Sequence, residues 1–225
     1  MTSAMTDFQI DIVNDARALL VLAHGAGAAM DSPFMAAMTA ALNDCGIGVL
    51  RFEFDYMAAR RTGGPRRPPP KVEMLCAAYL DVMSEVIERY DPCGPLLIGG
   101  KSLGGRVASM IADDVRGIAG VVCIGYPFHP VGKPSTLRTS HLGALTTPTL
   151  IVQGTRDALG SDAEVAGYDL AGSIKLHWLA DGDHDLKPRN RSGFSHDDHI
   201  QAAAEAIAAF VARLDSSPRA VSPQV

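Results

Sequence analysis

The sequence predicts an α/β fold, in which helices cover both faces of a mostly parallel sheet. Short apolar runs bounded by turn residues alternate with longer amphipathic stretches, the order expected of strands and crossover helices. Runs such as "ALLVLA", "GVVCI" and "TLIVQ" are continuously apolar, as strands become when helices bury them on both faces. A length of 225 residues suits one domain. We predict it over residues 1–215, followed by a disordered tail at 216–225.

Strands are predicted where an apolar run is short and turn residues flank it. These runs are Phe8 to Val13, Leu19 to Ala23, Gly48 to Phe54, Pro95 to Gly99, Ile118 to Ile124, Thr149 to Gln153 and Ile174 to Leu179. The longest irregular stretch, residues 125–148, is rich in Pro and Gly. An irregular stretch of that length in a compact domain is typically functional or disordered.

Helices are predicted between these strands from their caps and their apolar spacing. Asp31 or Ser32 can cap a helix whose first turn contains Pro33. Ser161 followed by Glu164 is a capping box, in which each side chain accepts from an otherwise unpaired backbone N–H. Apolar residues recur at helical spacing in three stretches, 34–45, 75–90 and 200–214.

The composition excludes several classes of protein. No apolar run approaches the roughly 20 residues that a membrane-spanning helix needs, and a formal net charge of −5 argues against a nucleic-acid surface. Residues 1–11 lack the basic and apolar regions of a secretory signal, so we expect a cytoplasmic protein. The four cysteines form no C-x-x-C pair, which predicts free thiols. His196 and His199 lack a third ligand at a telling spacing, so no metal is predicted.

Basic residues cluster in one segment of this acidic chain. The stretch "ARRTGGPRRPPPK" contains five basic residues and no acidic one: Arg60, Arg61, Arg66, Arg67 and Lys71. Its glycines and prolines predict a solvated loop. An alternative is that its arginines attract anionic acyl substrates to the rim of a site.

The stretch "LLIGGKSLGG" allows two interpretations. Gly100-Lys101-Ser102 resembles the end of a phosphate-binding loop, but that loop requires glycine where this chain has Pro95. The same residues, continued to Gly104, match Gly-x-Ser-x-Gly, the sharp turn from strand to helix that presents a catalytic serine. Glycine at both ends allows the close backbone approach that the turn needs. We therefore predict that Ser102 is a nucleophile.

A serine nucleophile needs a base to remove its proton and a carboxylate to orient that base. Asp157 follows the predicted strand in "TLIVQGTRDALG", and His184 follows the next one in "IKLHWLADGDHDLKP". Both therefore lie with Ser102 at the carboxyl edge of a parallel sheet, in the order Ser, acid, His. The alternative orienting acids are the neighbours of the histidine, Asp181, Asp183 and Asp185. Adjacent positions rarely fold back to the same ring, so Asp157 is preferred.

The loop "VLAHGAGAAMDS" is the candidate for the oxyanion hole. Its small residues let backbone N–H groups face the site. We predict the N–H groups of Ala26 and Leu103 as the donors, the second at the start of the helix after the serine. His24 is predicted to order this loop.

These motifs resemble those of the α/β-hydrolase superfamily, specifically its small dienelactone-hydrolase-related bacterial members, which are similar to testis-expressed hydrolase-like proteins. The matching blocks are "AHGAGAAMDSPFM", "VLRFEFDYM", "GGKSLGGR", "GYPFHPVGKP", "LIVQGTRDALG" and "DGDHDLKP". They span roughly Leu20 to Pro188. The resemblance implies an α/β-hydrolase fold in which Ser102, Asp157 and His184 occupy the triad positions.

The resemblance also bears on the pocket. Larger members insert a lid where this chain has only residues 125–148, so we expect no cap domain and an open pocket, lined by Tyr126, Phe128 and the basic loop. Lys101 departs from the aromatic or small residue common before the serine elsewhere. A buried ammonium needs a partner, and we expect Glu53 to be that partner.

The predicted function is that of a serine hydrolase of carboxylesterase or thioesterase type, which acts on small acyl substrates through an acyl-enzyme. No cofactor, nucleic acid or membrane is predicted as a partner, and the oligomeric state is left open. The alternative is a binding or scaffold protein with this fold and little activity, because related proteins include interaction scaffolds. A nucleotide-binding protein ranks third.

Overall fold

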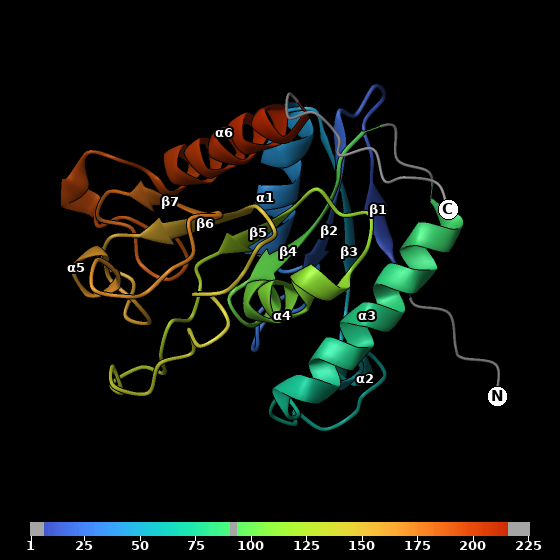
Figure 1. The fold of residues 1–225 in the computed structure, drawn as a ribbon, viewed down its shortest axis with the longest axis horizontal. Helices are drawn as coiled ribbons and strands as arrows, with labels where there is room; N and C mark the ends of the chain where they lie inside the picture. Colours follow the sequence, from blue (N-terminus) through green and yellow to red (C-terminus); the bar gives the residue numbers. More distant parts are fainter. Residues whose placement is uncertain (1–6, 91–93, 216–225) are drawn as a thin grey trace.

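A sheet in the order β1-β3-β2-β4-β5-β6-β7 forms the centre of the computed structural model, which describes residues 7–90 and 94–215 (Figure 1). Its strands are β1 (Gln9–Asp11), β2 (Ala18–Ala23), β3 (Ile47–Phe52), β4 (Leu96–Lys101), β5 (Gly120–Ile124), β6 (Thr149–Gly154) and β7 (Ile174–Leu179). β1 pairs antiparallel with β3, and the other neighbours pair in parallel. The tail predicted at 216–225 lies outside the described residues.

Helices cover both faces of the sheet, as Figure 1 shows for α6 and α4. The helices are α1 (Pro33–Asp44), α2 (Asp55–Arg61), α3 (Val72–Arg89), α4 (Leu103–Ile111), α5 (Asp162–Val165) and α6 (His196–Asp215), with short 3-10 turns at Ala112–Asp114 and Asn190–Ser192. α1 and α6 contact each other on one face, and α3 and α4 contact each other on the other. The predicted fold class is therefore confirmed.

The continuously apolar strands bury alternate side chains in two separate clusters. In β2, Leu19 and Val21 pack with residues of α3 and α4, whereas Leu20 and Leu22 pack with residues of α1 and α6. Every residue of β2 is buried. This double burial explains why the sequence shows no alternation of apolar and polar residues in the central strands.

The prediction of a loop over the whole basic segment is wrong at its start. Arg60 and Arg61 belong to α2, which begins at Asp55 and continues without a Gly or Pro until Gly63. Gly63 has a φ of 83°, a conformation that ends a helix without a steric cost only for glycine.

The predicted capping box is present at the start of α5. The Ser161 side chain accepts the backbone N–H of Glu164, and the Glu164 side chain accepts the backbone N–H of Ser161.

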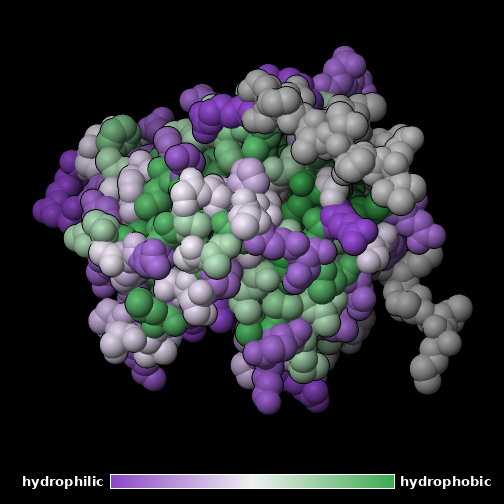
Figure 2. Space-filling model, viewed as in Figure 1, coloured by the Kyte–Doolittle hydropathy of each residue, from purple (hydrophilic) through white to green (hydrophobic). Residues whose placement is uncertain are grey.

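Residues 125–148 connect β5 to β6 without a helix or strand, and all of them are described. The chain therefore has no cap domain at this position. Figure 2 shows hydrophobic and hydrophilic residues interspersed on this face of the molecule. Among the described helices, none combines the length and apolar character needed to cross a membrane.

Candidate active site

Ser102 occupies a one-residue turn between β4 and α4. β4 ends at Lys101 and α4 begins at Leu103. The turn gives Ser102 a φ of 52° and a ψ of −112°, a conformation that non-glycine residues rarely adopt. Strained backbone of this kind persists where the surrounding structure enforces it, and it concentrates at functional sites.

The neighbouring glycines make this turn possible. A Cβ on Gly104 would lie 2.6 Å from the carbonyl oxygen of Ala23 and 2.7 Å from that of His24. A Cβ on Gly100 would lie 2.4 Å from the carbonyl carbon of Gly104. All three distances are shorter than a van der Waals contact, so the strand and the helix can approach this closely only without side chains at these positions.

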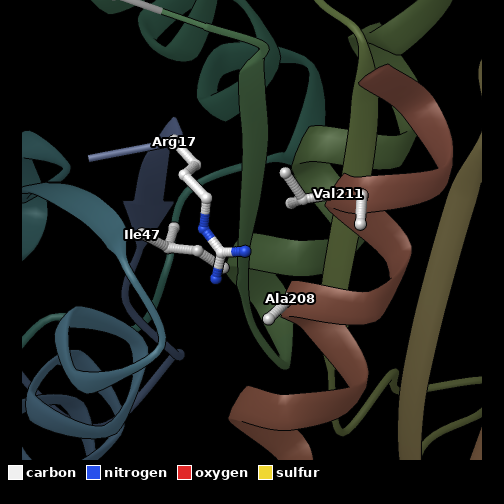
Figure 3. A pocket seen from close by; sticks show the side chains of 5 residues that line it. Arg17, Ile47, Ala208 and Val211 are labelled. Atoms are coloured by element: carbon white, nitrogen blue, oxygen red, sulfur yellow. The ribbon is translucent and has the colours of Figure 1, made fainter. Parts of the chain in front are cut away.

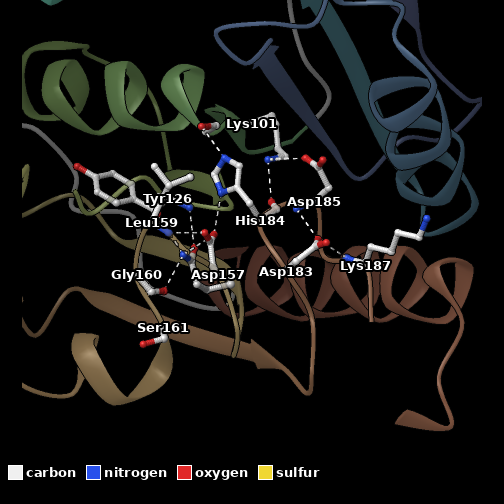
Figure 4. A network of polar contacts seen from close by, with 12 residues as sticks. Lys101, Tyr126, Asp157, Leu159, Gly160, Ser161, Asp183, His184, Asp185 and Lys187 are labelled. Carbon is white, nitrogen blue, oxygen red and sulfur yellow. Dashed lines mark hydrogen bonds and ion pairs between the residues drawn. The ribbon is translucent and has the colours of Figure 1, made fainter. Parts of the chain in front are cut away.

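Three side chains from distant segments meet beside this turn, and Figure 4 labels two of them, Asp157 and His184. Nε2 of His184 lies 2.9 Å from Oγ of Ser102, and Nδ1 of the same ring lies 2.8 Å from Oδ2 of Asp157. Asp157 follows β6 and His184 follows β7, so both lie at the edge where β4 presents the serine. The structure therefore brings together the three residues that the sequence singles out.

The Asp157 carboxylate is buried and held by two further donors. Nε2 of Gln153 donates to Oδ2 over 2.8 Å, and the N–H of Leu159 donates to Oδ1 over 2.8 Å. Oε1 of Gln153 also accepts a hydrogen bond from the N–H of Tyr126 over 2.6 Å. Gln153 is not among the predicted site residues, although a polar residue at the end of the apolar run "TLIVQ" is a signal for it.

The other acids near His184 have different partners. Asp181 pairs with Arg156 and Arg189. Oδ1 of Asp183 accepts the N–H groups of Asp185 and Lys187, each over 2.9 Å, and so shapes the histidine loop (Figure 4).

The loop after β2 passes along the other side of Ser102. Nε2 of His24 accepts the N–H of Phe54 over 3.2 Å, which leaves Nδ1 to donate to the carbonyl of Gly25 over 2.6 Å. Burial lowers the pKa of His24, in keeping with a neutral ring. Within the described part of the chain, no hydrogen bond occupies the N–H of Ala26 or of Leu103. Both donors are therefore free to bind an oxygen atom.

Helix α2 holds this loop in place. Arg61 donates to both carboxylate oxygens of Glu53, over 2.7 and 2.8 Å, and to Asp31 over 2.9 Å. Oε1 of Glu53 also accepts the N–H of Met30 over 3.1 Å. Tyr56 donates from its hydroxyl to the carbonyl of Ala26 over 3.2 Å. No pattern in the sequence predicts this role of Tyr56 and Arg61.

The expected pair between Lys101 and Glu53 is wrong. Nζ of Lys101 donates to the carbonyl of His184 over 2.8 Å and lies 3.2 Å from Oδ1 of Asp185. The Glu53 carboxylate is occupied by Arg61 and by the N–H of Met30 instead. The loop after β7 returns to the end of β4 and places Asp185 beside the lysine.

A pocket of about 330 Å³ opens beside the serine. It is lined by Gly25, Ala26, Gly27, Ala28, Ser32, Phe34, Met35, Lys101, Ser102, His184 and Asp185. The prediction that Tyr126 and Phe128 line it is wrong, because both are fully buried in the core, where the Tyr126 hydroxyl donates to the carbonyl of Arg138. Basic residues of segment 59–71 do not line the pocket either.

A second hollow, of about 140 Å³, lies between β3 and α6 and is shown in Figure 3. Arg17, Ile47, Ala208, Val211 and Ala212 line it. These side chains include no nucleophile and no base. The first pocket is therefore the one that carries reactive groups.

The histidines at the start of α6 are engaged in hydrogen bonds to backbone. Nε2 of His196 lies 2.8 Å from the carbonyl of Asp185, and Nδ1 of His199 lies 2.7 Å from that of Leu186. Within the described residues, no group of three or more potential metal ligands comes together.

The sequence matches a known protein family, and the structure is similar to several solved structures. The family model described as alpha/beta hydrolase domain matches residues 16–212. The structure is similar to that of Est1E from Butyrivibrio proteoclasticus, with a TM-score of 0.67, 15% identity, and coverage of 93% of this chain and 94% of that chain. It is also similar to dienelactone hydrolase from Anabaena variabilis, with a TM-score of 0.65, 21% identity, and coverage of 92% and 90%.

A third similar structure is the esterase domain of a Rhodothermus marinus protein, with a TM-score of 0.65, 19% identity and coverage of 92% of each chain. At these identities, the structural likeness indicates a shared fold over nearly the whole length of each chain.

Proposed function

The chain belongs to the alpha/beta hydrolase domain family, and on that premise we propose that it is a serine hydrolase that cleaves ester or thioester bonds of small acyl substrates through an acyl-enzyme. One observation carries the proposal. The contacts from Oγ of Ser102 to His184 and from His184 to Asp157, over 2.9 and 2.8 Å, form the continuous relay that an activated serine requires.

In the first half of the reaction, Nε2 of His184 accepts the proton of Ser102 while Oγ attacks the carbonyl carbon. Asp157 holds the Nδ1 proton and stabilises the imidazolium that forms. The carbonyl oxygen becomes negatively charged, and the free N–H groups of Ala26 and Leu103 are the proposed donors to it. The imidazolium then returns its proton to the departing alcohol or thiol, which leaves the acyl group on Ser102.

In the second half, water replaces the leaving group. His184 accepts a proton from the water as its oxygen attacks the acyl carbon, and then returns a proton to Oγ of Ser102. The acid leaves and the free enzyme is restored. No step requires a cofactor.

The pocket favours small substrates. Its volume of about 330 Å³ and the side chains of Phe34 and Met35 suit a short acyl or alcohol group. Residues 125–148 form no cap domain over the pocket, which leaves its entrance open. Ester chemistry is also the chemistry named for the esterase domain to which the fold is similar.

Hydrolysis of p-nitrophenyl esters of graded acyl length tests the proposal, with wild type compared to Ser102→Ala. We expect short esters to be hydrolysed and Ser102→Ala to lose on the order of a millionfold in kcat. Ser109→Ala is the matched control, because Oγ of Ser109 also lies 2.9 Å from a histidine, His141. That serine lies in the interior of α4 and outside the pocket, so we expect its loss to leave kcat unchanged.

Equal rates for wild type and Ser102→Ala would contradict the proposal. A folded wild type that hydrolyses no ester or thioester of the panel would favour the alternative of a binding protein with a hydrolase fold.

A further inference from the structure

The proposed reaction gives no role to Lys101, the residue directly before the nucleophile. Its side chain is only 8% exposed, although it carries an ammonium group. Burial of a charge is costly unless the group is paired and hydrogen bonded. A lysine at this position therefore needs an explanation from its surroundings.

The ammonium connects three parts of the site. It donates to the carbonyl of His184 over 2.8 Å, which ties the histidine loop to the end of β4. It also lies 3.2 Å from the carboxylate of Asp185 and 5.3 Å from the centre of the Phe34 ring, at the start of α1. Figure 4 shows the lysine and the histidine loop together.

The ammonium also lies close to the imidazole. A Cβ on Gly125 would be 3.1 Å from Nζ of Lys101 and 3.4 Å from Nδ1 of His184, so both atoms border the same backbone position. A positive charge there opposes the protonation of the ring, and nearby carboxylates favour it. The balance between these charges therefore affects how readily His184 acts as a base.

Several other charged or titratable groups face this pair. They are Asp157 at the end of β6, Asp183 and Asp185 in the histidine loop, and His196 of α6, which contacts the carbonyl of Asp185. Burial lowers the pKa of the Lys101 ammonium, and the Asp185 carboxylate is the largest influence that opposes this effect. Asp185 is 68% exposed, so its charge can be removed without burying a new group.

We propose that Lys101 is a positioning residue, which holds the His184 loop against the nucleophile strand and, paired with Asp185, places a charge beside the imidazole. This inference rests on the proposed serine chemistry. The tether and the charge, the two parts of the proposal, affect different features of the pH profile. Loss of the tether displaces the ring and lowers the rate at every pH, whereas loss of the charge moves the acid limb of the pH profile.

The test is the rate at which a fluorophosphonate labels Ser102 between pH 5 and 9, since labelling requires the same activated serine but no knowledge of the substrate. The variants are Lys101→Met, which removes the charge, Lys101→Arg, which keeps it, and Asp185→Asn, which removes the opposing charge. Lys175→Met is the matched control, because Lys175 is exposed on β7.

We expect Lys101→Met to lower the plateau rate on the order of a hundredfold, because a small displacement of the ring costs that much. Its acid limb should move to higher pH, since the ammonium no longer opposes protonation of the ring. Asp185→Asn should move the limb in the opposite direction. Lys101→Arg should restore the position of the wild-type limb, and Lys175→Met should leave both quantities unchanged.

A second measurement separates positioning from failure to fold. The ¹H NMR signal of the proton shared by His184 and Asp157 reports whether that hydrogen bond persists, and far-UV circular dichroism reports folding. We expect Lys101→Met to remain folded, because an apolar side chain of similar length replaces a buried charge, and to broaden or shift this signal.

Four outcomes overturn the inference or one of its parts. An unshifted acid limb in Lys101→Met contradicts the electrostatic part, and an unchanged plateau rate contradicts the tether. Shifts in the same direction for Lys101→Met and Asp185→Asn contradict the proposed balance of charges. Absence of labelling at Ser102 in folded wild type overturns the proposed function together with this inference, so the two failures are distinguishable.

Discussion

The Asp157 side chain has no exposed surface, and its two oxygens accept from His184, Gln153 and Leu159. A carboxylate in this position accepts the Nδ1 proton of the ring and leaves Nε2 free to act as the base. Asp157→Asn keeps the size of the side chain but can present an N–H to the ring, which favours the wrong tautomer. We expect kcat for the best ester to fall about ten thousandfold.

Asp183→Asn is the control for that substitution. Asp183 lies beside His184 in the sequence, but it accepts backbone N–H groups within the loop, and an asparagine oxygen can accept them equally well. We expect its kcat to remain within about tenfold of wild type. A larger loss in Asp183→Asn than in Asp157→Asn would reassign the orienting acid.

At this scale, the meeting of Ser102, Asp157 and His184 could be anticipated because each follows a strand of a parallel sheet, and these ends share one edge. The partner of Lys101 could not be anticipated, because Asp185 follows β7, which β5 and β6 separate from β4 in the sheet. The pair forms only because the loop after β7 returns to the lysine, and sequence order does not reveal the path of that loop.

The turn between β4 and α4 is the element on which the position of the serine depends. Gly104→Ala would bring a Cβ within 2.6 Å of the Ala23 carbonyl oxygen. Backbone atoms cannot move aside as a flexible side chain can, so we expect the free energy of unfolding to fall by about 1–3 kcal/mol or more. Urea denaturation followed by circular dichroism measures this change.

Gly172→Ala is the matched control, because a Cβ at that position would meet nothing within 4 Å. We expect its stability to stay within about 0.5 kcal/mol of wild type. If Gly104→Ala were as stable as Gly172→Ala, the close contact between β4, α4 and the loop after β2 would be contradicted.

Among the elements, the apolar runs predicted the strands to within a few residues, because burial on both faces leaves an unbroken apolar signal. Helix α2 was missed because it is short and its last residues begin a basic stretch that contains glycines and prolines. Its role depends on Tyr56 and Arg61 contacting a loop that lies about 30 residues earlier in the chain, and such contacts leave no local pattern.

The whole molecule should lose stability in acid through one buried histidine and two half-buried ones. Burial lowers the pKa of His24, of His177 and of His141, the last to about 4. The unfolded chain binds these protons near pH 6.5 and the folded chain does so only at lower pH. The stabilisation is therefore complete above about pH 6.5 and is lost as the pH falls towards 4.

His141→Gln tests the sign of this effect, since glutamine keeps a polar partner for Ser109 but does not titrate. The difference in unfolding free energy, wild type minus variant, should increase from pH 4 to pH 6.5 and then stay level. One proton contributes at most about 1.4 kcal/mol per pH unit, and solvent screening of this half-buried ring reduces that slope. A difference independent of pH would contradict a lowered pKa for His141.

The sheet as a whole brings together segments that lie far apart in the chain, and we propose that three of their side chains together activate Ser102. Mass spectrometry of the protein after treatment with a fluorophosphonate tests this claim most directly. We predict one adduct per chain, mapped by peptide digestion to Ser102 and lost in Ser102→Ala. A folded protein that forms no adduct, or an adduct that persists in Ser102→Ala, would contradict it.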